Sequence, residues 1–539
     1  MNSFRSSDIS LVSKEKNLIP KNFYILTSDG KSGGKMVVNM KYVIPGLVFI
    51  TIFCAGCIGT DDSEYWNGKG NDLLEEGKYT EAIQAFDKAI ELDPQNENAW
   101  SGKGIALAEI GNNEEAIQAF DKAIQLEPSN IEFWSEKGIA LRKMGRYEEA
   151  IEAYEKVMEI DPLDGFAWYN KGIALYHMGK YEEAIQAYDK ATELEPQFAT
   201  AWYNKGYALH YMGRYEEAIQ AYDKAIEIDP KDARTWNYKG VAYIELGSYY
   251  EAMEAFNNAI GLDPQYTKAL DNKGYVLNQM ERFEEAIQVC DKAIEIDPLD
   301  AKAWNYKGYA LNQMGRSEEA IQAFDKAIKI DPLDAEIWNY KGNALYEMKE
   351  YEEAIQNYNK ATEIDSQYTE AWKYKGMAFY DLKDYENAIR AFDKVIELEP
   401  QDYVAWDSKG DTLRRMGEYE EAIEAYDKAI EINPQGTWIW MHKGYALYEM
   451  ERYEEADQVF DKVIELNPKN FDAWYSKGNT LREMGKTDAS IKAYDKAIEI
   501  NPQYALAWYN KGIALDQAGE YSEAVSYYNK AKELGYEES

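Results

Sequence analysis

The chain repeats nearly the same sequence every 34 residues. Trp66 is followed by Trp at twelve of the next thirteen 34-residue steps, Leu270 being the exception, and Gly stands four residues after each of these fourteen positions. A fixed period of this length indicates an array in which each unit needs its neighbours to bury its apolar face. We therefore expect fourteen tandem units over residues 63–538. Their expected bounds are 63–96, 97–130, 131–164, 165–198, 199–232, 233–266, 267–300, 301–334, 335–368, 369–402, 403–436, 437–470, 471–504 and 505–538.

The spacing of apolar residues predicts two helices in each unit. Over residues 165–198 they recur at intervals of three and four, which is typical of amphipathic helices. Gly179 tolerates a positive φ and predicts the end of the first helix, while a proline near the end of the unit stops the second helix. We expect an aromatic ring of the second helix to pack where a side chain at the invariant glycine of the first would otherwise stand. The positions expected to be structural are Trp168, Gly172, Ala184, Tyr188 and Pro196.

This pattern of Trp, Gly, Ala, aromatic residue and Pro resembles the tetratricopeptide repeat. The resemblance covers residues 63–538 and implies an all-α fold, a right-handed superhelical α-solenoid of about fourteen 34-residue helix-turn-helix repeats. It further implies that first helices line a concave groove that binds peptides or proteins. One departure is the Lys before each invariant Gly, as at Lys171, where the family usually has Leu. We expect this Lys to be structural, with its stem on apolar surface and its ammonium in water.

The net charge of the chain limits the kinds of partner that it can bind. Lys and Arg total 59 against 97 Asp and Glu, a formal net charge of −38. Such a charge repels phosphate backbones, so we expect no nucleic acid partner. Apolar residues make up 45% of the chain, which is enough to form a packed core.

An apolar segment precedes the repeats. Residues 42–60 carry no charge, Lys41 lies before them and Asp61 after them. The segment resembles a prokaryotic lipoprotein signal, because Ala55 and Gly56 stand directly before Cys57, the expected site of lipidation. An uncleaved anchor and a buried stretch are the alternatives.

We divide this region into a leader at 1–39, a signal or anchor at 40–57 and a linker at 58–62. The leader is expected to be poorly ordered or untranslated, because Met36 and Met40 each offer an internal start. Positive charge before the segment and acidic charge after it favour attachment of the repeats to the outer face of a membrane, through this segment only. The alternative location is cytoplasmic.

No motif for chemistry stands out. The cysteines are Cys54, Cys57 and Cys290, without zinc spacing, and no phosphate-binding glycine loop or nucleophile motif occurs. We therefore expect no metal, no cofactor and no enzymatic activity. The function expected is a non-enzymatic scaffold for protein–protein interactions; the alternatives are a self-associating structural array or an accessory subunit of a glycosyltransferase or other enzyme complex.

The seventh unit differs from the others. Leu270 replaces Trp, Cys290 replaces the ring of the second helix, and Glu281 replaces the turn glycine. Loss of two buried rings weakens packing locally in an array stabilised by nearest neighbours. Leu270 and Cys290 thus mark a candidate hinge, unless nearby substitutions compensate.

Side chains one, five and eight residues after the marker Trp, with their neighbours, are expected to line the groove. Tyrosine with Arg favours protein binding, although these residues also fit a solvated helix face. A partner would be a protein or peptide, and self-association through the last unit, near Tyr521, is a further possibility. The candidate groove residues are Arg142, Lys143, Tyr169, Tyr176, His177, Tyr203, Tyr207, His210, Tyr211, Arg414, Arg415, Tyr445, Tyr448 and Arg482, with His442 beside the last group.

Overall fold

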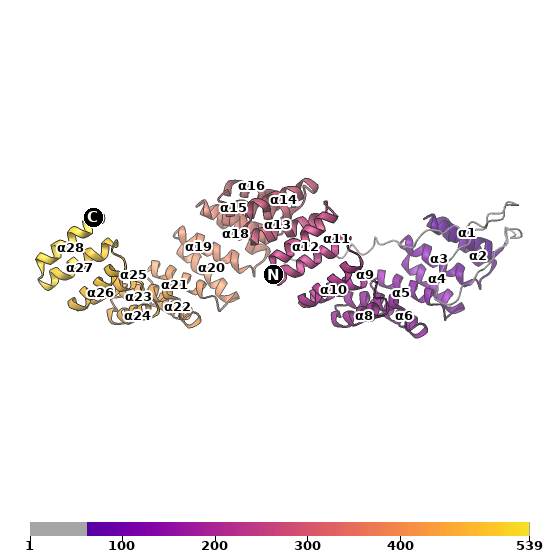
Figure 1. Ribbon diagram of the computed structural model, residues 1–539, viewed down its shortest axis with the longest axis horizontal. Helices are drawn as coiled ribbons and strands as arrows, with labels where there is room; N and C mark the ends of the chain where they lie inside the picture. Colours follow the sequence, from indigo (N-terminus) through magenta and orange to yellow (C-terminus); the bar gives the residue numbers. More distant parts are fainter. Residues whose placement is uncertain (1–61, 538–539) are drawn as a thin grey trace. The chain divides into compact units, whose positions relative to one another are not determined.

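The computed structural model describes residues 62–537, and the regular structure in this range consists of 28 α-helices without a strand. The chain divides into two compact units, Met1–Ile110 and Gly111–Ser539. Helices α1–α3 belong to the first unit and α4–α28 to the second (Figure 1). The expected all-α solenoid of helix-turn-helix repeats is confirmed. The leader, the apolar segment and Cys57 lie outside the described residues.

Odd-numbered helices are the first helices of the repeats. They are α1 (Ser63–Glu75), α3 (Glu97–Glu109), α5 (Ile131–Lys143), α7 (Gly165–His177), α9 (Ala199–Tyr211), α11 (Ala233–Glu245), α13 (Thr267–Gln279), α15 (Ala301–Gln313), α17 (Ala335–Glu347), α19 (Thr369–Asp381), α21 (Tyr403–Met416), α23 (Thr437–Glu449), α25 (Phe471–Glu483) and α27 (Ala505–Ala518).

Even-numbered helices are the second helices. They are α2 (Tyr79–Leu92), α4 (Asn113–Leu126), α6 (Tyr147–Ile160), α8 (Tyr181–Leu194), α10 (Tyr215–Ile228), α12 (Tyr249–Leu262), α14 (Phe283–Ile296), α16 (Ser317–Ile330), α18 (Tyr351–Ile364), α20 (Tyr385–Leu398), α22 (Tyr419–Ile432), α24 (Tyr453–Leu466), α26 (Thr487–Ile500) and α28 (Tyr521–Glu533).

Local sequence signals set the limits of the first helices. Before α7, the Asp164 side chain accepts a hydrogen bond from the Ala167 backbone N–H at 2.9 Å, which satisfies one free donor of the first turn. After α7, Gly179 has a φ of 75° and the Lys180 N–H donates to the Leu175 carbonyl at 3.0 Å. The left-handed glycine therefore ends the helix and turns the chain into α8.

The two helices of a repeat approach closely at the invariant glycine. A Cβ added to Gly172 would lie 2.6 Å from Cε1 of Tyr188, whose ring is buried against α7. Ala184, one turn earlier on α8, is fully buried in the same core cluster. Because no side chain separates the backbone of α7 from the ring, the pair is tightly packed.

The marker Trp connects successive repeats. The Trp202 indole N–H donates to the Pro196 carbonyl at 3.3 Å, and Trp304 contacts Pro298 in the same way at 3.2 Å. The proline that ends one repeat thus accepts a hydrogen bond from the first helix of the next. This bond uses a backbone carbonyl, and it persists where Ser366 replaces the proline.

The Lys before the invariant glycine makes two contacts. The Lys171 ammonium lies 2.7 Å from Oε1 of Glu155 and 5.6 Å from the centre of the Trp168 ring. Glu155 belongs to the second helix of the preceding repeat. The departure from the family pattern therefore adds an ion pair between repeats and a cation–π contact within α7.

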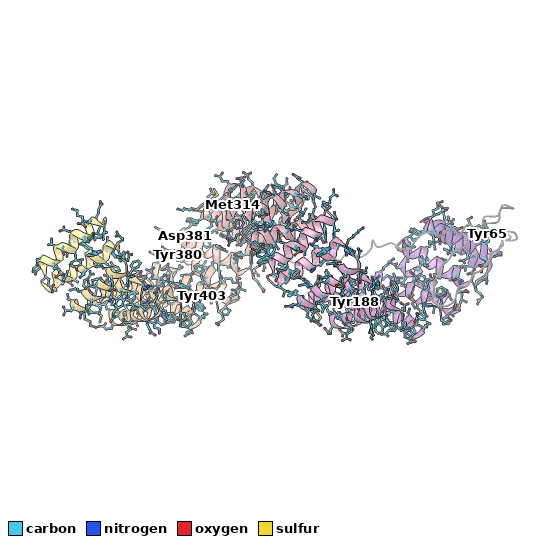
Figure 2. The ribbon with its side chains drawn as sticks, viewed as in Figure 1. Tyr65, Tyr188, Met314, Tyr380, Asp381 and Tyr403 are labelled. Atoms are coloured by element: carbon cyan, nitrogen blue, oxygen red, sulfur yellow. The ribbon has the colours of Figure 1, made fainter. Side chains whose placement is uncertain are left out.

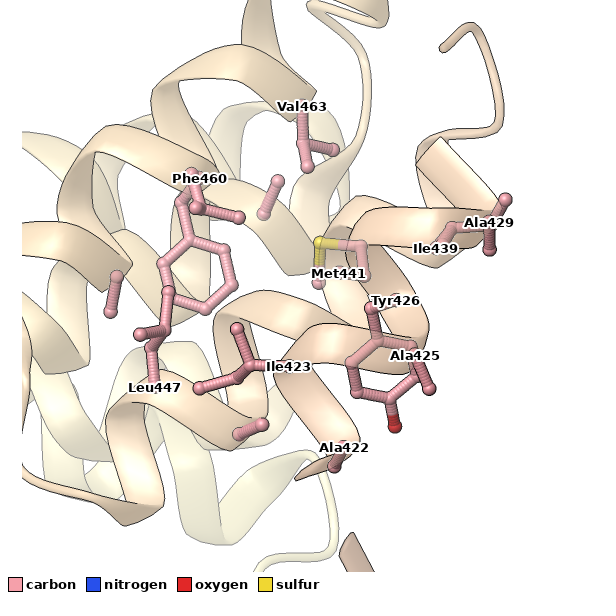
Figure 3. Close-up of a cluster of buried hydrophobic side chains, with 14 of the residues drawn as sticks. Ala422, Ile423, Ala425, Tyr426, Ala429, Ile439, Met441, Leu447, Phe460 and Val463 are labelled. Atoms are coloured by element: carbon pink, nitrogen blue, oxygen red, sulfur yellow. The ribbon is translucent and has the colours of Figure 1, made fainter. Parts of the chain in front are cut away.

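The core is a series of side-chain clusters between consecutive helices. In one cluster, Tyr426 and Phe460 are fully buried with Ile439 and Leu447, so that α22, α23 and α24 share one apolar interior (Figure 3). Each cluster involves neighbouring helices only, as expected for a linear array.

The seventh repeat retains a buried core. Leu270 and Cys290 are both buried, and a Cβ on Gly274 would lie 2.9 Å from the Cys290 sulfur. In this repeat α13 also packs directly on α15, where the amide of Asn278 donates to the Tyr306 carbonyl at 2.9 Å. This contact between first helices offsets part of the lost ring volume. The hinge at Leu270 and Cys290 stays a prediction.

Candidate interaction surface

The predicted residues of α7 and α9 form one aromatic cluster. The Tyr176 ring centre lies 5.5 Å from that of Tyr207 and 5.7 Å from that of Tyr211, and Tyr203 lies 6.2 Å from Tyr207. We call these four residues the tyrosine surface. Each stays partly accessible, and Tyr211 is 48% exposed. The tyrosine surface therefore offers partly exposed aromatic side chains to a partner.

Other rings extend the tyrosine surface. Tyr238 of α11 lies 5.1 Å from Tyr207, and Tyr181 of α8 lies 5.2 Å from Tyr176. Neither was among the predicted residues. Tyr238 stands two residues after its marker Trp, next to the first position expected to line the groove, which was the only signal for it in the sequence.

Tyr169 lies beside this surface rather than in it. Its ring packs 4.6 Å from Phe198, and its hydroxyl accepts a hydrogen bond from the Asn204 amide at 3.0 Å. Tyr169 thereby joins α7 to α9 and to the turn before α9. This contact gives it a structural role between repeats.

The two histidines contribute little positive charge at neutral pH. Burial lowers the pKa of His177, and the charge of Arg142 acts in the same direction; burial also lowers the pKa of His210. The His177 ring stacks on Tyr147 with centres 5.4 Å apart. The cationic groups here are therefore Arg142, which is half-buried, and Lys143, which is exposed.

The predicted cations of α21 and α25 are occupied within the chain. Arg414 pairs with Asp411 at 2.5 Å, and Arg415 donates to the Tyr380 hydroxyl at 3.1 Å. Arg482 donates to Asn510 at 2.6 Å and pairs with Glu483 at 2.7 Å. A partner would have to compete with these contacts.

The neighbouring aromatic residues of α23 are also engaged. The Tyr445 hydroxyl donates to Asp472, and the Tyr448 ring lies 5.4 Å from Tyr453. Nδ1 of His442 lies 2.9 Å from Asp407. This second group of predicted residues is a network of internal contacts, spread over helices α21 to α25 rather than gathered in one cluster.

A cavity that the sequence analysis missed lies among α15, α16, α17 and α19. Its volume is about 190 Å³, and we call it the aromatic pocket. The buried Phe324 ring and Asn312 lie deepest, four partly exposed tyrosines form the sides, and the carboxylate of Glu347 lies at an exposed edge. The lining residues are Tyr309, Asn312, Gln313, Phe324, Tyr340, Asn343, Tyr346, Glu347 and Tyr374. Tyr309 and Asn343 occupy the fifth position after the marker Trp, which is one of the positions expected to line the groove. The sequence pattern could therefore have indicated both residues.

Carboxylates surround the aromatic pocket. The Tyr340 hydroxyl donates to Glu336 at 2.8 Å, and Tyr346 donates to Asp381, which lies beside Tyr380 at the end of α19 (Figure 2). Burial raises the pKa of Glu347, and a hydrogen bond from Asn312 lowers it, with no cation contributing. Burial also raises the pKa of Glu336. The pocket is thus aromatic inside and acidic at its edge.

Residues 62–537 contain neither a metal-binding cluster nor a membrane-spanning helix. This range contains no cluster of three or more His, Cys, Asp or Glu side chains that could hold a metal ion. None of its helices combines the length and apolar character that crossing a membrane requires.

Comparison with known families supports the repeat assignment. Models described as tetratricopeptide repeat or TPR repeat match residues 67–131, 131–163, 369–402, 391–424, 410–451, 439–470, 459–492, 478–519 and 505–534. Residues 157–371 match the family described as cilia and flagella-associated protein 70 C-terminal domain. No curated protein matches the chain.

Three solved structures show similarity to this chain. The crystal structure of the APC/C hetero-tetramer Cut9-Hcn1 has 15% identity and a TM-score of 0.40, covering 88% of this chain and 94% of that one. YrrB, described as a TPR protein with an unusual peptide-binding site, has 28% identity and a TM-score of 0.32, covering 35% and 98%. MamA has 30% identity and a TM-score of 0.29, covering 30% and 93%.

The fold and its repeated sequence define the class of the protein as a helical-repeat scaffold. The chain is a tetratricopeptide-repeat protein. This family is one of protein-interaction scaffolds that are typically noncatalytic.

Proposed function

We propose that the chain is a non-enzymatic scaffold whose first helices form a groove for peptides or partner proteins, with the tyrosine surface as a contact region. The observation that carries this proposal is the partly exposed cluster of Tyr176, Tyr203, Tyr207 and Tyr211 on adjacent first helices. Large amphipathic rings with few rotatable bonds are common at the energetic centres of protein interfaces.

The experiment is affinity capture from solubilised membranes, with the wild-type chain compared with a Tyr207→Ala and Tyr211→Ala double variant. Tyr250→Ala is the matched control, because Tyr250 is 78% exposed on the second helix α12. The proposal requires a protein retained by the wild type and the control but reduced about tenfold or more in the double variant. Equal retention by all three would contradict it.

We further propose that the amino-terminal segment tethers the repeats to the outer face of a membrane through a lipid on Cys57. The uncharged segment and the small residues before Cys57 support this proposal. A Cys57→Ser variant should lose acyl labelling and leave the membrane fraction. Unchanged fractionation with no labelling in the wild type would favour an uncleaved anchor.

Self-association is a second candidate, because α28 leaves apolar side chains accessible. Tyr521 is 68% exposed and Val525 is 55% exposed. Pairing of two α28 helices would bury the Tyr521 and Val525 side chains of both copies. Sedimentation should show dimers that a Tyr521→Ser and Val525→Ser double variant dissociates, whereas a monomer at high concentration would eliminate this candidate.

A further inference from the structure

The aromatic pocket differs from the tyrosine surface in its chemistry. It is a cavity with a buried floor, four tyrosine sides and acidic groups around it. A volume of about 190 Å³ is smaller than the sites that enclose a drug-sized ligand or cofactor, which occupy roughly 300–1,000 Å³. The space suits the end of one side chain.

The rings favour a cation over a neutral group. The Tyr309 and Tyr340 ring centres lie 5.2 Å apart at 59°, so two tilted π-systems border the same cavity. A cation over such rings is attracted by their quadrupoles, and more strongly where water is excluded. The hydroxyls of Tyr340 and Tyr346 already donate hydrogen bonds to Glu336 and Asp381, which leaves their rings richer in electrons.

The charged groups around the aromatic pocket also favour a cation. Glu347 has no Lys or Arg partner among the described residues, and Glu370 adds negative charge close to Tyr309 and Tyr374. Burial raises the pKa of Glu370, and the one cation within residues 62–537 that lowers it, Lys373, is held by Asp402 at 2.5 Å. The pocket therefore carries negative charge that the chain itself does not neutralise.

We propose that the aromatic pocket binds the positively charged end of a Lys or Arg side chain from a partner, with the tyrosine rings around the cation and Glu347 beside it. This proposal rests on the proposed function, because it takes the pocket as part of the partner-binding surface. It predicts that the partner carries a basic residue in the segment that contacts α15, α17 and α19.

The test uses the full chain and two small probes. N-acetyl-arginine amide carries the cation, and N-acetyl-citrulline amide is nearly the same shape without it. Saturation-transfer NMR titrations should show the arginine probe binding at least about fivefold more tightly than the citrulline probe. Equal binding of the two probes, or binding of neither, would overturn the proposal.

Two variants and a matched control locate the site. Glu347→Gln removes one charge at the pocket, and Tyr309→Leu replaces a π-face by an apolar side chain; each should weaken the arginine probe about three- to tenfold. Glu353→Gln makes the same charge change on an exposed position of α18 and should have no effect. Circular dichroism on all three confirms folding, so loss of structure is separated from loss of binding. An equal effect of Glu347→Gln and Glu353→Gln would assign the binding to general charge and refute the pocket.

The probe-binding test of the pocket and the partner-capture test of the proposed function can fail independently. If partner capture depends on Tyr207 and Tyr211 while neither probe distinguishes Glu347→Gln from the wild type, the inference about the pocket fails alone. If the pocket binds the arginine probe but no partner depends on the tyrosine surface, the proposed function fails while the cation site stands.

Discussion

The Tyr188 ring occupies the space that a side chain at Gly172 would need, with 2.6 Å between Cε1 of the ring and the position of the missing Cβ. Equivalent pairs recur along the chain, as at Gly342 and Tyr358, where the distance is 2.5 Å. The invariant glycine therefore reflects close packing between helices rather than backbone flexibility, since it lies inside α7 with helical geometry.

Gly172→Ala should destabilise the protein by about 1–3 kcal/mol, because the added methyl group overpacks the contact with a rigid ring. Gly261→Ala is the matched control: Gly261 lies in α12 with open space around it, so alanine should stabilise by up to about 1 kcal/mol. Urea unfolding of both variants measures the difference. A similar free energy of unfolding for the two variants would contradict this explanation, because it would mean that the Tyr188 ring moves aside at no energetic cost.

Within residues 62–537, four turns place a residue other than glycine in the left-handed region, among them Lys349 with a φ of 65°. A side chain in this conformation is strained, so Lys349→Gly should stabilise by about 0.5–1 kcal/mol. The reverse change in the preceding repeat, Gly315→Ala at a φ of 73°, should destabilise by about 1 kcal/mol. Thermal unfolding of the pair tests this account, and a loss of stability in Lys349→Gly would contradict it.

The sequence predicted the repeat fold well because its signals are local and recur. The helix limits near Gly179 and Pro196 follow from turn chemistry, and the contact of Tyr188 with α7 follows from the invariance of Gly172. Each repeat packs against neighbours of similar sequence, so the two-helix assignment made for one repeat also applies to the other repeats.

Contacts between side chains of different repeats were not predictable in this way. The pairing of Lys171 with Glu155 and the hydrogen bond from Arg415 to the Tyr380 hydroxyl depend on the angle between helices of different repeats. Cavities are harder still, because the aromatic pocket exists only where four helices leave space around Phe324. Residue type alone therefore indicated Arg414 and Arg415 as groove cations, although both are held by partners within the chain.

A buried carboxyl in the seventh repeat should make stability depend on pH. Burial, with the nearby Asp300 carboxylate, raises the pKa of Asp271 to about 9, and Asp297 adds to the shift while Lys302 opposes it. The unfolded value is near 4. Between these values the folded chain binds more protons than the unfolded chain, so this group lowers the free energy of unfolding as the pH rises from about 4 to 9.

Asp271→Asn removes this titration. At pH 8 the variant should be more stable than the wild type by about 1–3 kcal/mol, and the gain should shrink towards pH 4. Asp325→Asn is the control, because Asp325 is paired with Lys341 at the surface. Urea unfolding at several pH values provides the measurement; a gain that does not vary with pH would show that Asp271 is ionised in the folded state.

The candidate hinge predicts early opening of the seventh repeat. Amide hydrogens of α13 and α14 should exchange faster than those of α11, α12, α15 and α16, because Leu270 and Cys290 fill less space than the rings they replace. The direct contact between α13 and α15 works against this effect. Hydrogen-exchange mass spectrometry decides between the two, and uniform protection from α11 to α16 would eliminate the hinge.

The central claim is that first helices, and not second helices, bind the partner. The most direct measurement is hydrogen-exchange mass spectrometry of the full chain with and without a captured partner. The account predicts slower exchange in peptides from α7, α9 and α11, with α8, α10 and α12 unchanged. Protection confined to the second helices, or no protection at saturating partner, would contradict it.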